Sequence, residues 1–417
     1  MNKFLLLSIS SLCFSFSAYA GGFKIGLQGQ KQIGMGHTGV GFVQDAATIY
    51  FNPAGMSFIG NQVNIGCNAL MPNTSFLETN TNLLTKADAQ VFTPFSVYAS
   101  SKLYKKFNIG LGIYTPFGSG MAYPKDWGGE YILHKINLTT IYLQPTLSYK
   151  ISKKLAVGAG FVYSTGHVTL EKDLPINSMS NSTIASAELK GAANGIGYNA
   201  GAYLRLNEQL SFGLTYHSKV LMKVKEGTAN FKDIPTALTA SFPATNTFTT
   251  TLALPSELSF GVAYRLADHV IFALDLNRTF WNSYDSLGFD YGVNTDKVTD
   301  AKSPRNYQDV SAIRVGVQYE MSSKFVFRTG FFYDQTPVKD GYVAPELPDN
   351  NKIGFTLGAS VQVAKNVKLD FSFLYESVPS RKQTNLETGL SGTFQTKAIA
   401  PGIGIQYQFN KKNNPKK

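Results

Sequence analysis

The C-terminal half of the chain alternates apolar residues with small or polar ones at a period of two. In the segment 355–363, for example, the apolar side chains of Phe355, Leu357 and Val361 are separated by single small or polar residues. The same pattern recurs in the segments 313–319, 367–375 and 402–409. Because successive side chains of a strand point to opposite faces, each segment predicts a β-strand with one apolar face.

Connections between these segments alternate between short and long. Tight polar turns are expected near 105–106, 152–154, 207–208, 267–268, 322–323 and 365–366, with long connections at roughly 116–137, 167–195, 222–252, 281–305, 336–350 and 379–395. This alternation is typical of a transmembrane barrel, in which an even number of antiparallel strands, here about fourteen, is joined by short turns at one rim and long loops at the other. The expected strands cover 62–71, 91–101, 107–115, 138–150, 155–165, 196–206, 210–221, 254–265, 269–280, 310–320, 324–334, 353–363, 367–377 and 396–409.

Composition supports a barrel that faces lipid. Only 16% of the residues are charged, whereas 13% are aromatic. A soluble array of β-sandwiches would expose many phenylalanines and valines to water. In lipid every backbone polar group must be paired, and a closed barrel is the β-structure that achieves this. The predicted fold class is therefore all-β, a transmembrane antiparallel β-barrel.

The N-terminus resembles a secretory signal peptide covering residues 1–20. Lys3 is the basic region, residues 4–16 are the apolar region, and Ala18-Tyr19-Ala20 fits a cleavage site. Cleavage would leave Cys67 as the single thiol, so no internal disulfide is expected. An exported barrel of this kind is expected in the bacterial outer membrane.

Residues 21–60 show no strand periodicity and are rich in glycine, which predicts a plug, or hatch, folded inside the barrel of residues 61–409. The hatch ends in Asn52, Pro53, Ala54 and Gly55, where the proline fixes φ and the asparagine can bond nearby backbone. We hypothesise that this turn latches the hatch to the wall and shifts when ligand binds; a purely structural turn is the alternative. Residues 410–417 form a basic tail.

The positive charge of the chain does not indicate that it binds nucleic acid. The sequence pI is about 9.3, but the lysines are dispersed or paired in turns rather than gathered on one helix or stripe. Attraction to anionic membrane lipid is the expected use of this charge. The segment 34–39 fits GxGxxG without the strand–turn–helix context that dinucleotide binding needs, and the histidines lack metal-ligand spacing. No cofactor, metal site or catalytic residue is expected, so an enzyme is not predicted.

Several short motifs, in this order behind a signal peptide, carry a family resemblance. They are Asp45-Ala46-Ala47 with Phe51-Asn52-Pro53-Ala54-Gly55, Thr115-Pro116-Phe117-Gly118 with Asp126-Trp127-Gly128-Gly129-Glu130-Tyr131, Leu254-Pro255-Ser256 with Asp275 and Trp281, and Arg328-Thr329-Gly330 with Thr336-Pro337-Val338 and Leu347-Pro348-Asp349-Asn350. Together they resemble the FadL family of outer-membrane long-chain fatty acid transporters, which also includes aromatic-hydrocarbon channels. The resemblance covers nearly the whole mature chain.

The resemblance implies a fourteen-stranded barrel that catches cargo at an external groove. Cargo then enters an interior pocket and leaves sideways where the third strand kinks. The expected third strand carries Gly110 and Gly112, and glycine inside a strand often marks a bend. Alternatively, these glycines make room for the hatch. A monomer in contact with outer-membrane lipid and lipopolysaccharide is expected.

Two arginines are the candidate ligands for a carboxylate head group. By strand parity Arg314 and Arg328 face the lumen, where an unpaired charge is costly. Each is either a substrate ligand or half of an internal ion pair, with Asp275, Asp370 and Glu376 as the lumen-facing candidate partners.

The leading functional hypothesis is passive uptake of long-chain fatty acids, gated by the hatch. Uptake of aromatic hydrocarbons or other small hydrophobic molecules is the alternative within transport. A surface adhesin or structural barrel is the alternative outside it. The hatch argues against a general porin.

Overall fold

The chain folds into one closed antiparallel barrel. A computed structural model describes residues 21–177 and 184–409, and its strands form a ring of 14 positions in one sheet. The ring closes where the first strand pairs with the last, with Ile65 opposite Ile405. No helix among these residues is long and apolar enough to cross a membrane. The expected signal peptide and basic tail lie outside the described residues, and the predicted fold class is confirmed.

Several positions of the ring are occupied by two successive segments. The strands of the N-terminal half are β1 (Gln62–Asn68), β2 (Met71–Glu78), β3 (Leu84–Lys86), β4 (Phe95–Tyr104), β5 (Phe107–Tyr114), β6 (Gly118–Ala122), β7 (Lys135–Lys150), β8 (Leu155–Asn177), β9 (Ile184–Arg205), β10 (Leu210–His217) and β11 (Val220–Lys232). Those of the C-terminal half are β12 (Thr245–Leu254), β13 (Ser256–Ala267), β14 (Val270–Phe280), β15 (Ser286–Tyr291), β16 (Ala301–Pro304), β17 (Val310–Glu320), β18 (Phe325–Asp334), β19 (Lys352–Ala364), β20 (Val367–Thr384) and β21 (Ser391–Gln408).

Three of the expected long connections are wrong, because strands occupy most of them. The segment 167–195 is largely β8 and β9, the segment 222–252 is largely β11 and β12, and the segment 379–395 is largely β20 and β21. In β11 the apolar Val220, Met222 and Val224 are buried inside, while Lys223 and Lys225 point outward. The apolar face of β11 therefore points into the lumen. This is expected of a part of the barrel that extends beyond the membrane, where the outer face meets water and the lumen is apolar.

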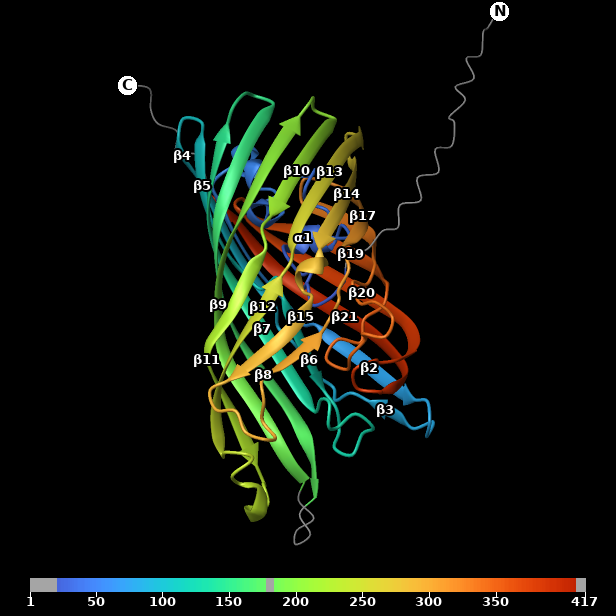
Figure 1. Ribbon diagram of the computed structural model, residues 1–417. Coiled ribbons are helices and arrows are strands. Elements are labelled where there is room, and N and C mark those ends of the chain that lie inside the picture. Colours follow the sequence, from blue (N-terminus) through green and yellow to red (C-terminus); the bar gives the residue numbers. More distant parts are fainter. Residues whose placement is uncertain (1–20, 178–183, 410–417) are drawn as a thin grey trace, which may run out of the picture.

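The connections between strands are short at one rim of the barrel and long at the other. In Figure 1 the short turns lie at the upper end, while the long hairpins and loops, including β8–β9, extend at the lower end. In outer-membrane barrels the short turns face the periplasm, so the lower end in this view is external. Between the rims large apolar side chains face outward, as a lipid-exposed band requires. Examples are Ile65, Phe161, Phe260, Phe355, Leu357 and Ile403.

The hatch, residues 21–60, lies in the lumen (Figure 1). It contains the short helices α1 (Gln30–Ile33) and α2 (Thr48–Phe51) and the 3₁₀ helix η1 (Pro53–Phe58), whose residues are buried except for the half-buried Phe58. The remaining 3₁₀ helices, η2 (Thr236–Leu238) and η3 (Trp281–Ser283), belong to connections between strands. With its lumen occupied in this way, the barrel is not an open pore.

Candidate functional site

Polar side chains of both the wall and the hatch hold the hatch in place. The carboxylate of Asp275 on β14 is fully buried and accepts hydrogen bonds from the backbone N–H groups of Gly39 (2.7 Å), Val40 (2.9 Å) and Gly41 (3.4 Å). From the hatch, Asn52 donates to the carbonyl of Ala202 on β9 at 3.0 Å. A charged acceptor with three buried donors is a strong anchor, because none of the donors could find water instead.

Glycines in the wall let the hatch approach the strands at backbone distance. Gly213 on β10 and Gly261 on β13 are opposite each other in register, and both face the hatch. A methyl group on Gly213 would overlap the carbonyl of Val40, and one on Gly261 would overlap the backbone of Gly41. Only glycine fits at these two positions, so this part of the hatch is fixed to the wall.

An apolar space, here called the outer cavity, lies between the hatch and the external end of the barrel. Its volume is about 100 Å³. Arg305 lies at its edge and forms a 2.8 Å ion pair with Glu346, which links two external loops. The apolar lining comes mainly from the inward faces of β7, β8, β11, β12 and β15 and includes Leu138, Val168, Leu170, Met222, Leu252 and Phe289.

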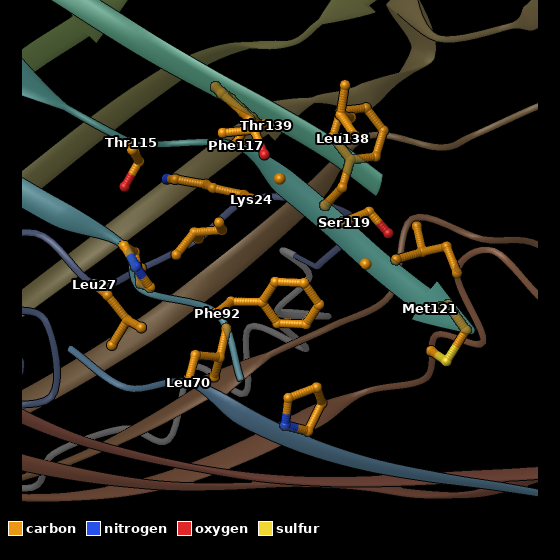
Figure 2. A pocket seen from close by; sticks show the side chains of 18 of the residues that line it. Lys24, Leu27, Leu70, Phe92, Thr115, Phe117, Ser119, Met121, Leu138 and Thr139 are labelled. Carbon is orange, nitrogen blue, oxygen red and sulfur yellow. The ribbon is translucent and has the colours of Figure 1, made fainter. Parts of the chain in front are cut away.

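A larger space, the inner cavity, has a volume of about 510 Å³. It lies between the first residues of the hatch and β6, and Figure 2 shows Lys24, Phe92 and Leu138 around it. Phe23 lines both cavities and packs edge-on against Trp281, with 4.8 Å between the ring centres. Ser119, Leu138, Glu346 and Leu347 also line both cavities, so Phe23 is one part of the boundary between them.

The inner cavity reaches the outer surface through an interruption in the wall. Pairing of β4 with β5 ends at Ser96 and Tyr114, and the two sides meet again through a 2.8 Å bond from the N–H of Asp88 to the carbonyl of Ala122. The space between residues 89–94 and 115–121 is here called the wall opening. Phe92 lies at this opening, between Leu70 and Ser119 in Figure 2. Its ring occupies the place that a side chain at Gly120 would need.

The hatch itself pairs with the strand edge beside the wall opening. The N–H of Ile25 bonds to the carbonyl of Pro116 at 2.8 Å, and the N–H of Gly118 bonds to the carbonyl of Phe23 at 3.0 Å. The first hatch residues thus replace the missing neighbour strand on the inner side. A movement of residues 23–25 would change both the barrier between the cavities and the inner edge of the opening.

Gly110 and Gly112 lie in a continuous part of the third strand. Both are paired with β4 on one side and with β7 on the other. A side chain at Gly110 would meet Met56 and Ile49 of the hatch, and one at Gly112 would also meet Ile49. These glycines therefore make room for the hatch, and the interruption of the strand lies further along, at residues 115–117.

The deep end of the inner cavity is polar. Lys24 forms an ion pair with Glu257, and Lys352 lies 3.6 Å from Asp349 and 3.9 Å from Glu376. Burial alone would lower the pKa of Lys24, but the carboxylate of Glu257 outweighs it, so the pKa is raised and the ammonium stays charged. Of these two cations, Lys352 has the looser contacts with carboxylates.

The hatch also contributes His37 to a small polar cavity of about 40 Å³ beside Lys24 and Lys352. Burial, followed by the positive charge of Arg314, places the pKa of His37 well below its usual value. The imidazole is consequently neutral at neutral pH.

Both candidate arginines face the lumen, but neither has the expected partner. Arg314 pairs with Asp334 at 3.0 Å and donates to Asn277, while its register neighbour Asp275 binds the hatch. Arg328 donates to Gln318 at 2.8 Å and to the hydroxyl of Ser360 at 2.6 Å.

Only Arg314 borders an internal cavity, the small polar one. Arg328 lies towards the periplasmic rim, beside Gln44 of the hatch. Of the other proposed partners, Asp370 accepts from Ser360 and lies 3.8 Å from Lys31, and Glu376 lies near Lys352.

Four residues around the cavities and the wall opening were not identified from the sequence. Phe23 lies in the hatch, where no strand was expected. Phe92 was expected inside a strand over 91–101, but β4 begins only at Phe95 and Phe92 forms an isolated bridge with Leu70. Gly120 and Lys352 are ordinary residues of strands. A useful signal was Pro116, because proline has no N–H for a sheet ladder and so indicates an interrupted strand.

Comparison with known proteins places this geometry in one family. The model of the family described as "Outer membrane protein transport protein (OMPP1/FadL/TodX)" matches residues 11–409. A long-chain fatty acid transport protein of Salmonella typhi is 22% identical over 88% of this chain and 90% of its own length.

Two solved barrels have the same fold. A FadL homologue of Pseudomonas aeruginosa superposes with a TM-score of 0.82 at 19% identity, covering 94% of this chain and 100% of its own. The toluene transporter TodX of P. putida gives a TM-score of 0.71 at 16% identity, covering 92% of this chain and 99% of its own.

Proposed function

The chain belongs to the outer-membrane FadL/TodX family of transporters for hydrophobic compounds, and from this premise we propose that it takes up long-chain fatty acids. In this proposal the fatty acid enters the outer cavity from the external loops and passes Phe23 into the inner cavity. It then leaves sideways through the wall opening into the membrane, past Phe92. Uptake in this proposal is passive, so the fatty acid moves down its own concentration gradient.

The observation that carries the proposal is the shape of the inner cavity, apolar along its length and polar at its deep end. Its wall presents Leu70, Phe117 and Leu138 to a chain, while Lys24 and Lys352 lie at the polar end. Burying about fifteen methylenes at ~0.8 kcal/mol each gives an upper limit of about 12 kcal/mol, so the tail supplies most of the affinity. The cation orients the head group.

Growth of a transporter-deleted host that carries this chain tests the proposal. We expect growth on oleate as sole carbon source and not on an aromatic hydrocarbon. Growth on the hydrocarbon alone would reject fatty acids as the cargo and support uptake of aromatic hydrocarbons instead. Failure on both, with the barrel present in the outer membrane, would reject transport and favour an adhesin or structural barrel.

Uptake of monoaromatic hydrocarbons is the second candidate, and the outer cavity favours it. At about 100 Å³ this cavity suits a single ring better than an extended chain, and Phe289 and Tyr284 in its lining can pack against a ring. An apolar cargo would need no cation. The response to removal of the head-group cation therefore separates the two candidates.

Lys352 is the head-group ligand in the fatty-acid proposal. We expect Lys352→Gln to weaken oleate binding about tenfold, since a charge-assisted hydrogen bond is replaced by a neutral one. Binding of methyl oleate should change less than twofold. Isothermal titration of both ligands measures the effect, and equal losses would contradict a head-group role. Arg314→Gln and Arg328→Gln are tested in the same way. If either variant weakens binding of oleate more than binding of methyl oleate, that arginine is the head-group ligand.

Gating in this proposal resides in the first hatch residues, with the turn at Asn52–Gly55 as a fixed anchor. The hydroxyls of Ser57 on η1 and Ser148 on β7 are 2.7 Å apart, which suits replacement by a disulfide. A Ser57→Cys/Ser148→Cys variant, made in a Cys67→Ser background, should retain more than half of wild-type uptake when oxidised. Uptake that is lost on oxidation and restored by reduction would show that the whole hatch must move.

A further inference from the structure

Lysines gather on two neighbouring periplasmic hairpins of the barrel. Strand β5 pairs with both β4 and β7, so the β4–β5 and β7–β8 turns lie side by side on the rim. In Figure 1 these turns lie at the upper left. The set of lysines named here the basic rim is Lys105, Lys106, Lys153 and Lys154, which occupy the two turns.

No negative charge on these hairpins balances the basic rim. The segments 93–123 and 136–170 contain no aspartate or glutamate. Within the described ranges 21–177 and 184–409, no ion pair involves a lysine of the basic rim. Three of the other four periplasmic turns differ, because each carries an acidic residue in or beside it. These residues are Glu208, Asp268 and Glu320.

The basic rim lies at the boundary between lipid and water. The ammonium of Lys105 is 4.9 Å from the ring centre of Tyr104, and that of Lys106 is 5.8 Å from the ring centre of Tyr149. Next to them Leu103 faces outward with 58% of its surface exposed. Aromatic rings and cations beside an exposed apolar side chain are typical of head-group depth in a membrane.

From this one-sided arrangement we infer that the basic rim binds the phosphates of anionic phospholipids in the periplasmic leaflet. Charge complementarity identifies an anion, and the apolar neighbours identify a lipid rather than a soluble acidic protein, since Leu103 would lie among acyl chains. The same strands lead to the wall opening, because β5 continues into β6. Anionic lipid is therefore enriched on the side of the barrel that contains the opening, whichever cargo the barrel carries.

Quenching of a tryptophan reporter by brominated lipid tests the inference. The native Trp127 and Trp281 are 2% and 0% exposed, so lipid-borne bromine does not reach them. A Leu103→Trp reporter sits beside the basic rim, and a Val363→Trp reporter sits at a similarly exposed lipid-facing position near the β19–β20 turn, on another part of the same rim. Vesicles of phosphatidylcholine containing brominated phosphatidylglycerol or brominated phosphatidylcholine give the relative binding constant at each reporter.

We expect a preference of at least tenfold for phosphatidylglycerol at Leu103→Trp and less than twofold at Val363→Trp, since each lysine near the surface contributes about fivefold. Adding Lys105→Gln/Lys106→Gln/Lys153→Gln/Lys154→Gln should abolish the preference. A matched set that removes four charges elsewhere, Lys324→Gln/Lys365→Gln/Lys382→Gln/Lys397→Gln, should leave it intact. Heat-modified migration on gels confirms that each variant is folded.

Equal preferences at the two reporters would overturn the inference, as would a preference that survives loss of the four rim lysines. Polyglutamate, added to protein in neutral vesicles, serves as the probe for a soluble acidic partner. Binding of polyglutamate to the basic rim without any lipid preference would overturn the lipid assignment in favour of a protein.

Discussion

A Gly120→Glu variant is expected to lose at least nine-tenths of fatty-acid uptake. Gly120 lies in the wall opening, and its missing side chain leaves the space that the ring of Phe92 fills. A glutamate there displaces the ring and places a carboxylate on the apolar route. The charge costs about 2 kcal/mol in this setting, which corresponds to about a thirtyfold slower passage. Uptake of radiolabelled oleate by whole cells measures the effect.

Gly288→Glu is the matched control for this prediction. Gly288 is on β15 at the external end, and the nearest atom to an added Cβ lies 3.5 Å away, so a side chain there makes an ordinary van der Waals contact and no overlap. Uptake by this variant should stay within twofold of the wild type. If Gly120→Glu also transports at the wild-type rate while the barrel is folded, cargo does not use the wall opening.

Replacing Asp275 with alanine is expected to loosen the hatch and make the barrel leak ions. The change removes the acceptor of the N–H groups of Gly39, Val40 and Gly41, all of which are buried. Each unsatisfied buried donor costs about 1 kcal/mol or more, so the hatch loses about 3 kcal/mol of attachment. Planar-bilayer recordings should show openings that are absent from the wild type.

Asp275→Asn separates loss of the anchor from general damage. The amide keeps one acceptor oxygen, so conductance should lie between those of the wild type and the alanine variant. Asp340→Ala removes a carboxylate that is 93% exposed, and should conduct as the wild type does. A closed Asp275→Ala barrel would mean that the glycine contacts alone hold the hatch.

The sequence predicts the membrane part of the strands well because lipid on one side enforces the alternation. The segment 353–363 was expected as a strand, and β19 covers Lys352–Ala364. The external extensions were missed, since outside the lipid the outward face turns polar, as Lys223 and Lys225 on β11 illustrate. Beyond the membrane the apolar face of such a strand points into the lumen and the polar face points into water. A search for strands with a lipid-facing apolar side therefore mistakes this segment for a polar loop.

The candidate site was less predictable because parity gives the face of a residue and not its partner. Parity places Arg314 in the lumen correctly, but the carboxylate that neutralises it is Asp334 on the adjacent strand β18, which was not among the expected partners. Phe23 acquires its position only when the hatch folds against β6, a contact between segments far apart in the chain. The interruption at Pro116 was visible as a proline, whereas Gly110 and Gly112 are explained by hatch packing.

Photo-labelling with a fatty acid that carries a diazirine near the end of its tail tests lateral exit most directly. Mass spectrometry of the labelled protein in vesicles maps where the tail goes. The proposed route predicts labels on Phe23, on Phe92 and within residues 115–121, with competition by unlabelled oleate. Labels that instead follow the polar periplasmic part of the lumen, around Gln44 and Arg328, would contradict passage through the wall.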